Sequence, residues 1–234
     1  MKLRQWDSLP EFMKSDKVRV YYDLLSKKQF QLGLKRAFDV VVAVIMLIIL
    51  AIPMLIIAVM IKLDSPGPVF YRQERVTAYG KRFRIHKFRT MVDNADKIGT
   101  TVTVDGDARI TKVGNRLRNL RIDEIPQLID VLTGNMSFVG TRPEATKYVK
   151  QYTDEMNATL LLPAGITSEA SIRYKDEAEL LDAADDIDKA YIEKVLPGKM
   201  KYNLQSIRNF SFPGEIAIMF RTVFALNGLS KKHS

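Results

Sequence analysis

The sequence contains no cysteine, and its two histidines, His86 and His233, lie far apart along the chain. Disulfide bonds, thiol catalysis and cysteine-ligated zinc are therefore excluded, and so is a cluster of histidine metal ligands. Acidic side chains are fewer than basic ones, 27 against 36, so the formal net charge is +9. This excess favours a polyanionic partner such as nucleic acid, an anionic membrane surface or a phosphorylated substrate. The length of 234 residues suits one domain with an appendage, in a protein that faces the cytosol.

Charge is also absent from residues 40–61, which are almost wholly apolar. A helix of this length reaches about 33 Å, enough to cross the hydrocarbon core of a bilayer. Basic residues flank the segment on both sides, so the positive charges give no orientation for a simple crossing. Pro53 lies in the middle, where it removes a backbone hydrogen bond and bends the helix. We predict a re-entrant membrane helix that kinks at Pro53, with an ordinary kinked spanning helix as the alternative.

The central pattern is found in residues 116–130, where three arginines precede the adjacent Asp123 and Glu124 and an amphipathic helix follows. Proline is tolerated only in the first turn of a helix, so Pro126 predicts that the helix begins near Asp123. Free N–H groups and the helix dipole at such a start favour negative charge and lower the pKa of a carboxylate. The structural alternative is that Asp123 serves as an N-cap and Glu124 as a first-turn acid.

Two strands are predicted at residues 69–76 and 81–87, joined through Tyr79 and Gly80. The second strand and its end carry a cluster of basic residues with Phe83 and Phe88 among them. Its members are Lys81, Arg82, Arg84, His86, Lys87 and Arg89. Such a cluster either binds phosphates in a site or forms a patch held to anionic lipid.

Further along, residues 136–140 are typical of a short buried strand. Residues 141–144 then fit a capping box with Pro143 in the first turn of a second helix. Arg142 at that helix start is well placed to bind a phosphate, with an ordinary surface arginine as the alternative. Helices are also predicted at residues 191–205 and 215–226.

Six motifs between residues 35 and 143 occur in the order that is typical of one family, and the match to that family covers roughly residues 32–226. They are residues 35–39, 65–70, 87–91, 107–114, 123–128 and 136–143. Each motif alone is weakly specific, whereas six in order are strongly specific. With them the chain resembles the bacterial sugar transferases, monotopic polyprenyl-phosphate phosphoglycosyltransferases that initiate capsule, exopolysaccharide and glycoprotein glycan assembly.

This resemblance implies the transfer of a sugar 1-phosphate from a UDP-sugar to polyprenyl phosphate, with release of UMP. It implies that Asp123 is the nucleophile, which forms a covalent phosphosugar intermediate, and that Mg²⁺ is required and is bound by Glu124. Attack of a carboxylate on a diphosphate brings two anions together, so cations must neutralise the charge. The candidate phosphate-binding residues are Arg118 and Arg142 first, then Lys87 and Arg89.

The chain departs from the family pattern in two places. Thr141 stands where a proline commonly precedes the Arg142-Pro143 pair, a modest change to a turn. Residues 168–174 replace a Gly-Trp sequence and a polar loop that are expected to touch the nucleotide and the sugar. The identity of the sugar therefore stays open, and Arg173 is added as a weaker candidate for substrate binding.

The predicted fold class is α+β and predominantly helical. Residues 1–36 form a polar, amphipathic segment, in which Val18, Tyr21, Tyr22, Leu24 and Leu25 predict one short amphipathic helix. Residues 37–63 form the re-entrant membrane helix, and residues 64–234 a cytosolic interfacial catalytic domain that starts with the basic β-hairpin. We expect the protein at the cytoplasmic face of the bacterial inner membrane, with a UDP-sugar, polyprenyl phosphate and membrane lipids as partners, and without nucleic acid. The oligomeric state, a homodimer included, stays open.

Two other functions compete with this one. The first is a membrane-anchored basic protein that binds anionic lipid or nucleic acid without catalysis. The second is a single-pass glycosyltransferase of another mechanism, which would release UDP rather than UMP and form no adduct on the protein.

Overall fold

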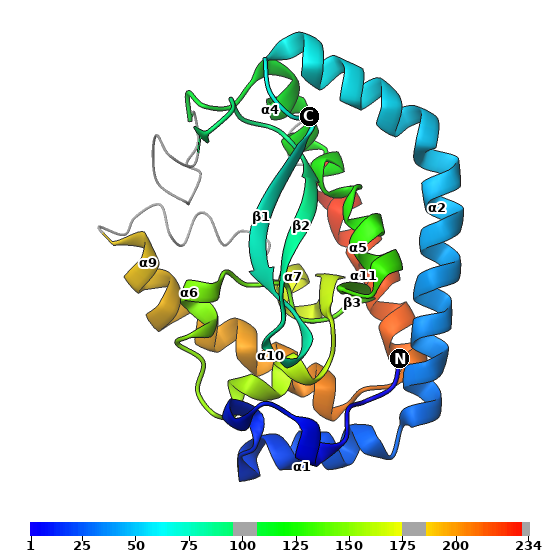
Figure 1. The fold of residues 1–234 in the computed structure, drawn as a ribbon, viewed down its shortest axis with the longest axis vertical. Coiled ribbons are helices and arrows are strands. Elements are labelled where there is room, and N and C mark those ends of the chain that lie inside the picture. Colours follow the sequence, from blue (N-terminus) through cyan, green and yellow to red (C-terminus); the bar gives the residue numbers. More distant parts are fainter. Residues whose placement is uncertain (96–106, 175–185, 231–234) are drawn as a thin grey trace.

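The computed structural model describes residues 1–95, 107–174 and 186–230, and most of them are helical (Figure 1). The largest element is α2, Gln29–Asp64, a single helix that continues through Pro53. Figure 1 shows α2 running up one side of the molecule and then turning over its top. The expected boundary between residues 36 and 37 falls inside this helix.

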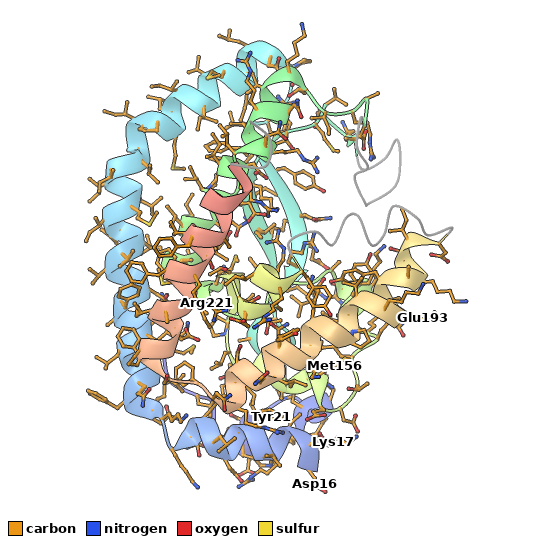
Figure 2. All side chains as sticks on the ribbon, turned by 180° about the vertical axis from the view of Figure 1, so that it is seen from behind. Asp16, Lys17, Tyr21, Met156, Glu193 and Arg221 are labelled. Carbon is orange, nitrogen blue, oxygen red and sulfur yellow. The ribbon has the colours of Figure 1, made fainter. Side chains whose placement is uncertain are left out.

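The two faces of α2 differ in what they contact. Its inner face buries residues at helical spacing against the rest of the chain: Leu32, Lys35, Asp39, Ala43 and Ile61. Its outer face exposes large apolar side chains, and Figure 2 shows side chains projecting outward from it. They include Ile45, Ile48, Ile49, Ile52, Leu55, Ile56 and Val59. Within the described ranges, α2 is the one helix long and apolar enough to cross a membrane. An exposed apolar face of this extent indicates a contact with lipid.

Next in sequence, β1 (Phe70–Val76) and β2 (Arg82–Phe88) pair as an antiparallel hairpin. The turn is the short 3-10 helix η3 (Ala78–Gly80), where both Tyr79 and Gly80 have positive φ. The two predicted strands are therefore present. The register places Tyr71 opposite Lys87, so the side chains of both residues leave the same face of the hairpin.

The second sheet is parallel and has two strands. β3 (Met136–Val139) is fully buried, as predicted, and pairs with β4 (Ala164–Thr167). Helix α5 (Gln127–Thr133) contacts α2, β2 and β3. Apolar side chains from these elements form the core beneath the site, among them Phe83, Leu128, Val131, Met136 and Phe138.

The N-terminal segment packs on the protein itself. Helix α1 (Asp16–Ser26), which the sequence predicted, buries Val18, Tyr21 and Leu25 in a core shared with the C-terminal half of the chain. Figure 2 shows Tyr21 on α1 beneath α10. The remaining elements are η1 (Trp6–Ser8), η2 (Glu11–Met13), α4 (Lys112–Asn119), η4 (Ile122–Glu124), α6 (Thr146–Val149), η5 (Met156–Leu161), α7 (Glu169–Arg173), α9 (Ile187–Ala190), the π-helical η6 (Tyr191–Val195), α10 (Leu196–Arg208) and α11 (Phe212–Ser230).

The helix predicted from the capping box at residues 141–144 is wrong. The chain is irregular there, and the short helix α6 begins only at Thr146, without a side-chain cap. Glu144 is buried, and its carboxylate accepts a hydrogen bond of 2.5 Å from the Tyr191 hydroxyl on η6. This tertiary bond competes with the local backbone bond that a capping box requires.

Three charged side chains fasten α2 to the elements that carry the site. Arg36 donates to two carbonyls at the C-terminal end of α5, over 2.7 and 2.8 Å. Asp64 accepts a hydrogen bond of 2.9 Å from the Val113 N–H in the first turn of α4. Arg89, just after β2, donates to carbonyls at the C-terminal end of α2 and beyond it. The apolar helix and the polar domain are thereby held in one arrangement.

Candidate active site

A break between two short helices presents Asp123 and Glu124. After α4 the backbone of Arg121 is left-handed, with φ 53°, and both carboxylates then lie in the single 3-10 turn η4. Helix α5 begins only after Pro126, so the start predicted near Asp123 was too early. The reason is local: the Ile125 N–H bonds to the Ile122 carbonyl, which tightens this turn into 3-10 geometry.

Glu124 accepts hydrogen bonds from two cations. The Lys87 ammonium on β2 and the Arg142 guanidinium after β3 each lie 2.7 Å from the same oxygen, Oε1. Burial alone would raise the pKa of Glu124, but Arg142 and Lys87 hold it well below its usual range. Burial also lowers the pKa of Lys87, although Glu124 opposes that shift. Three predicted site residues therefore form one partly buried ion cluster.

Asp123 shifts in the opposite direction from its neighbour. Burial raises the pKa of Asp123, and Lys87 and Arg118 offset only part of this effect. The lowered pKa expected from a helix start is therefore wrong, because Asp123 lies in a partly buried 3-10 turn rather than at the start of α5. A carboxylate that has lost part of its hydration and keeps cations near it suits nucleophilic attack.

A buried histidine–aspartate contact helps to place Lys87. Asp130 on α5 accepts from the backbone N–H of His86 and contacts its Nδ1, each over 2.8 Å. His86 directly precedes Lys87, and α5 directly follows the turn that carries Glu124. This contact therefore fixes the hairpin relative to η4, and with it the ion pair between Lys87 and Glu124. The sequence alone gave no sign of this role for Asp130.

Both carboxylates open onto a cavity of about 740 Å³. We call it the cationic cavity, after the basic side chains that line it: Arg72, Arg75, Lys87, Arg89, Arg109, Arg118, Arg121 and Arg142. A cavity of this size with convergent polar groups is typical of a ligand site. Guanidinium and ammonium groups gathered in this way suit an anionic, phosphorylated ligand.

Arg75 is a residue of the cavity that the sequence reasoning missed. Burial lowers the pKa of its guanidinium, and the nearby Glu144 opposes that shift. The sequence did contain a signal for Arg75. Alternate residues of a strand point to the same face, so Arg75 shares a face of β1 with Tyr71, which pairs with Lys87. Placing Lys87 in the hairpin register would therefore have put Arg75 on the site face of β1.

Of the remaining candidate residues for substrate binding, Arg118 and Arg89 line the cationic cavity and Arg173 does not. Arg118 lines the cationic cavity and lies near Asp123. Arg89 borders the cavity, but its guanidinium donates to carbonyls at the end of α2. Arg173 is half-exposed on α7, where it pairs with Glu169 and lies over the Tyr202 ring, and it does not line the cationic cavity.

A second cavity, of about 370 Å³, adjoins the first. We call it the apolar groove, because its walls are mostly aliphatic and aromatic. They include Met46 of α2, Ile125 and Leu128, Phe138 of β3, Ile166 of β4 and Val223 of α11. The two cavities share Arg121, Glu124 and Arg142. A charged site thus lies at the polar end of an apolar groove.

The carboxylates fit a magnesium ion that also binds a substrate. Among the described residues, no three His, Asp or Glu side chains gather into a metal site of their own. Mg²⁺ is commonly held by one or two carboxylates together with substrate phosphates, rather than by a complete protein cage. Glu124, which borders the cationic cavity, is the residue that would hold it there.

The comparison with known families decides the assignment. The profile described as "Bacterial sugar transferase" matches residues 30–228, which include α2, the hairpin and the carboxylate turn. The chain belongs to the bacterial sugar transferase family. The family resemblance drawn from the six sequence motifs is therefore confirmed.

Individual relatives are similar over most of this chain. A UDP-glucose:undecaprenyl-phosphate glucose-1-phosphate transferase of Escherichia coli is 40% identical, over 82% of this chain and 39% of its own length. A UDP-N-acetylgalactosamine-undecaprenyl-phosphate N-acetylgalactosaminephosphotransferase of Aeromonas hydrophila is 37% identical, over 81% and 43%. The exopolysaccharide production protein ExoY of Sinorhizobium fredii is 29% identical, over 82% and 84%. The chain thus spans about two fifths of the first two relatives and most of the third.

Proposed function

We propose that this protein transfers a sugar 1-phosphate from a UDP-sugar to polyprenyl phosphate, giving polyprenyl-diphosphate-sugar and UMP. The observation that carries the proposal is the position of the adjacent carboxylates where two cavities meet: Asp123 and Glu124 both line the cationic cavity, and Glu124 also lines the apolar groove. A nucleotide sugar is anionic and soluble, whereas a polyprenyl phosphate is mostly apolar. The printed names of the Escherichia coli and Aeromonas hydrophila relatives describe this class of reaction.

In the first step, we propose, a carboxylate oxygen of Asp123 attacks the phosphorus that bears the sugar. A bond forms from Asp123 to that phosphorus, and the bond between the two phosphates breaks. UMP leaves with the bridging oxygen, and the sugar phosphate stays on Asp123. Arg118, and the cations that Glu124 holds in place, stabilise the negative charge that gathers on the phosphates.

In the second step, an oxygen of the lipid phosphate attacks the phosphorus of the adduct. A diphosphate bond forms, the bond to Asp123 breaks, and Asp123 leaves as a carboxylate. Neither step requires a net gain or loss of protons when the acceptor is a dianion. Splitting the transfer in this way lets UMP depart before the lipid phosphate enters the same site.

We further propose that the reaction depends on Mg²⁺. When bound, the ion neutralises phosphate charge and polarises the bond that breaks. Glu124 is the residue proposed to bind it, while Lys87 and Arg142 orient the Glu124 carboxylate.

The proposed location is the cytoplasmic face of the bacterial inner membrane, with α2 re-entering the bilayer. In support, α2 packs against the domain along one face and exposes an apolar face along the other. A helix that lies against its own domain at both ends would place that domain on one side of the membrane. Accessibility labelling of tags at both termini tests this topology, since tags on opposite faces would refute it.

The catalytic proposal is tested with full-length protein, Mg²⁺, polyprenyl phosphate and a panel of UDP-sugars, by measuring UMP release. Asp123→Asn is expected to lose at least about 10³-fold in rate, because the variant lacks the nucleophile. Intact-protein mass spectrometry should detect a sugar-phosphate adduct on the wild type and none on Asp123→Asn.

Release of UDP instead of UMP would indicate a glycosyltransferase of another mechanism. Product formation without any adduct would refute the covalent route. Absence of turnover with every donor, together with binding of anionic vesicles that charge reversal at Arg82 and Arg84 abolishes, would indicate a membrane-anchored binding protein.

A further inference from the structure

The guanidinium of Arg121 stands out among the basic side chains of the site. It lines both the cationic cavity and the apolar groove, whereas Arg118 lines only the cationic cavity. Arg142 also lines both, but it is bonded to Glu124. To the residues that the structure describes, the Arg121 side chain makes no hydrogen bond or salt bridge.

The backbone holds Arg121 at this junction. Its φ of 53° is one of three positive values among the described residues other than glycine. The left-handed conformation is unfavourable for such a residue, and strain of this kind collects at functional sites. Here it separates α4 from η4, so the Arg121 side chain departs two residues before Asp123.

The surroundings of Arg121 resemble the boundary between water and lipid. The preceding residue, Leu120, is 69% exposed although it is large and apolar. Val223, which lines the groove, is 55% exposed on α11, and Phe220 and Phe224 of the same helix are more exposed still. Helix α11 contacts α2, whose outer face is apolar, and Figure 2 shows the two helices side by side. The groove is therefore walled by the two helices that present apolar surface outward.

We propose that Arg121 binds the phosphate of the lipid acceptor, while the apolar groove holds the first isoprenoid units of its chain. This inference rests on the proposed function and assigns the acceptor half of it. A lipid phosphate has one charged end on a long apolar chain, and the groove with Arg121 at its polar end matches both parts. Bound in this way, the phosphate reaches the phosphorus on Asp123 from the groove side, and the diphosphate bond forms as the bond to Asp123 breaks. Arg118, which lines only the cationic cavity, binds the phosphates of the UDP-sugar donor.

The test compares Arg121→Gln with the matched variant Arg118→Gln in initial-rate measurements on the full-length protein. Both substrates are varied, the acceptor being undecaprenyl phosphate in detergent. Arg121→Gln is expected to raise the KM for undecaprenyl phosphate by about 10- to 100-fold, because one charge-assisted phosphate contact is lost. Its KM for the UDP-sugar should stay within about twofold. UMP release in a single turnover without acceptor should keep the wild-type rate.

Arg118→Gln should show the reverse pattern, with a raised KM for the donor and slower single-turnover UMP release. Arg121→Lys keeps the charge and should recover part of the acceptor affinity. Arg116→Gln, an exposed position on α4 that lines neither cavity, controls for loss of positive charge.

The proposal for Arg121 is overturned if Arg121→Gln raises the KM for the UDP-sugar donor instead of the KM for the lipid acceptor, or if it changes neither KM. A wild-type protein that makes no product from any UDP-sugar would overturn the proposed function itself. The two failures are distinguishable, because the first requires an active wild-type enzyme and the second its absence.

Discussion

Two partly buried glutamates of this protein each face a lysine, yet their pKa values shift in opposite directions. Glu215 on α11 is 14% exposed and pairs with Lys35 of α2. Burial raises the pKa of Glu215, and Lys35 offsets only part of the effect. Glu124 is 19% exposed and pairs with Lys87, but Arg142 binds it as well. With two cations, the pKa of Glu124 falls well below its usual range.

The difference separates a structural ion pair from a candidate active site. At Glu215 a single cation offsets the lost hydration only in part, and the nearby Asp39 adds to the rise in pKa, whereas at Glu124 two cations outweigh the effect of burial. Lys35 also donates to the Val139 carbonyl, and Glu215 borders a cavity of about 30 Å³, too small for a substrate. The cluster at Glu124 opens onto two large cavities. Burial and charge alone thus do not identify a site, but access to a substrate-sized cavity does.

The largest expected effect is at the structural pair. Lys35→Met leaves Glu215 buried without its cation and should lower the free energy of unfolding by about 3–5 kcal/mol. Adding Glu215→Leu removes the stranded carboxylate and should recover most of that loss. Denaturant unfolding in detergent measures both. If Lys35→Met lowers the free energy of unfolding by less than about 1 kcal/mol, the pair of Lys35 and Glu215 does not stabilise the fold as proposed.

At the site, the loss should fall on activity instead. Arg142→Gln leaves Lys87 on Glu124, so we expect stability to fall by about 1–2 kcal/mol. The kcat/KM for UMP release should fall by about 10²–10³-fold, because a cation is removed from the developing phosphate charge. If Arg142→Gln lowers stability but not activity, the ion cluster at Glu124 is structural rather than part of the active site.

The pH dependence of stability should differ in sign between the two glutamates. Glu124 has a lowered pKa, so it contributes stability above about pH 4.3 that is lost as the pH falls further. The loss in free energy of unfolding caused by Glu124→Gln should therefore grow as the pH rises from about 3 to 5. Glu215 has a raised pKa, so the folded state binds more protons than the unfolded one. The cost of Glu215→Gln should shrink as the pH rises above about 4.3.

Equilibrium unfolding across this pH range gives both curves. If the losses in free energy of unfolding change with pH in the same direction for the two variants, the opposite pKa shifts of Glu124 and Glu215 are contradicted.

The smallest effect is expected at Arg173, which the sequence proposed for substrate binding. Its guanidinium pairs with Glu169 on the surface of α7. Arg173→Gln should change kcat/KM by no more than about twofold and stability by about 0.5 kcal/mol or less. A rise in the KM for the UDP-sugar beyond tenfold would restore Arg173 to the donor site.

Elements that depend on local pattern were predictable from the sequence. The hairpin strands, the buried strand after α5, helix α1 and the long apolar helix follow from periodicity and composition. Local rules failed where a distant residue competes for the same group. Glu144 bonds to Tyr191 instead of capping a helix, and Arg89 binds the end of α2 and not only the cavity. Asp123 has a raised pKa because neighbouring elements bury it.

By itself, the sequence determined the apolar helix, the order of the motifs and the pair of carboxylates, because these depend on adjacent residues. Only the tertiary structure decided which cations reach the carboxylates. Lys87, Arg118 and Arg142 come from three separate segments, and hydrogen bonds between those segments fix their spacing. The meeting of the cationic cavity with the apolar groove at Arg121 also depends on packing between segments distant in sequence, which no local pattern encodes.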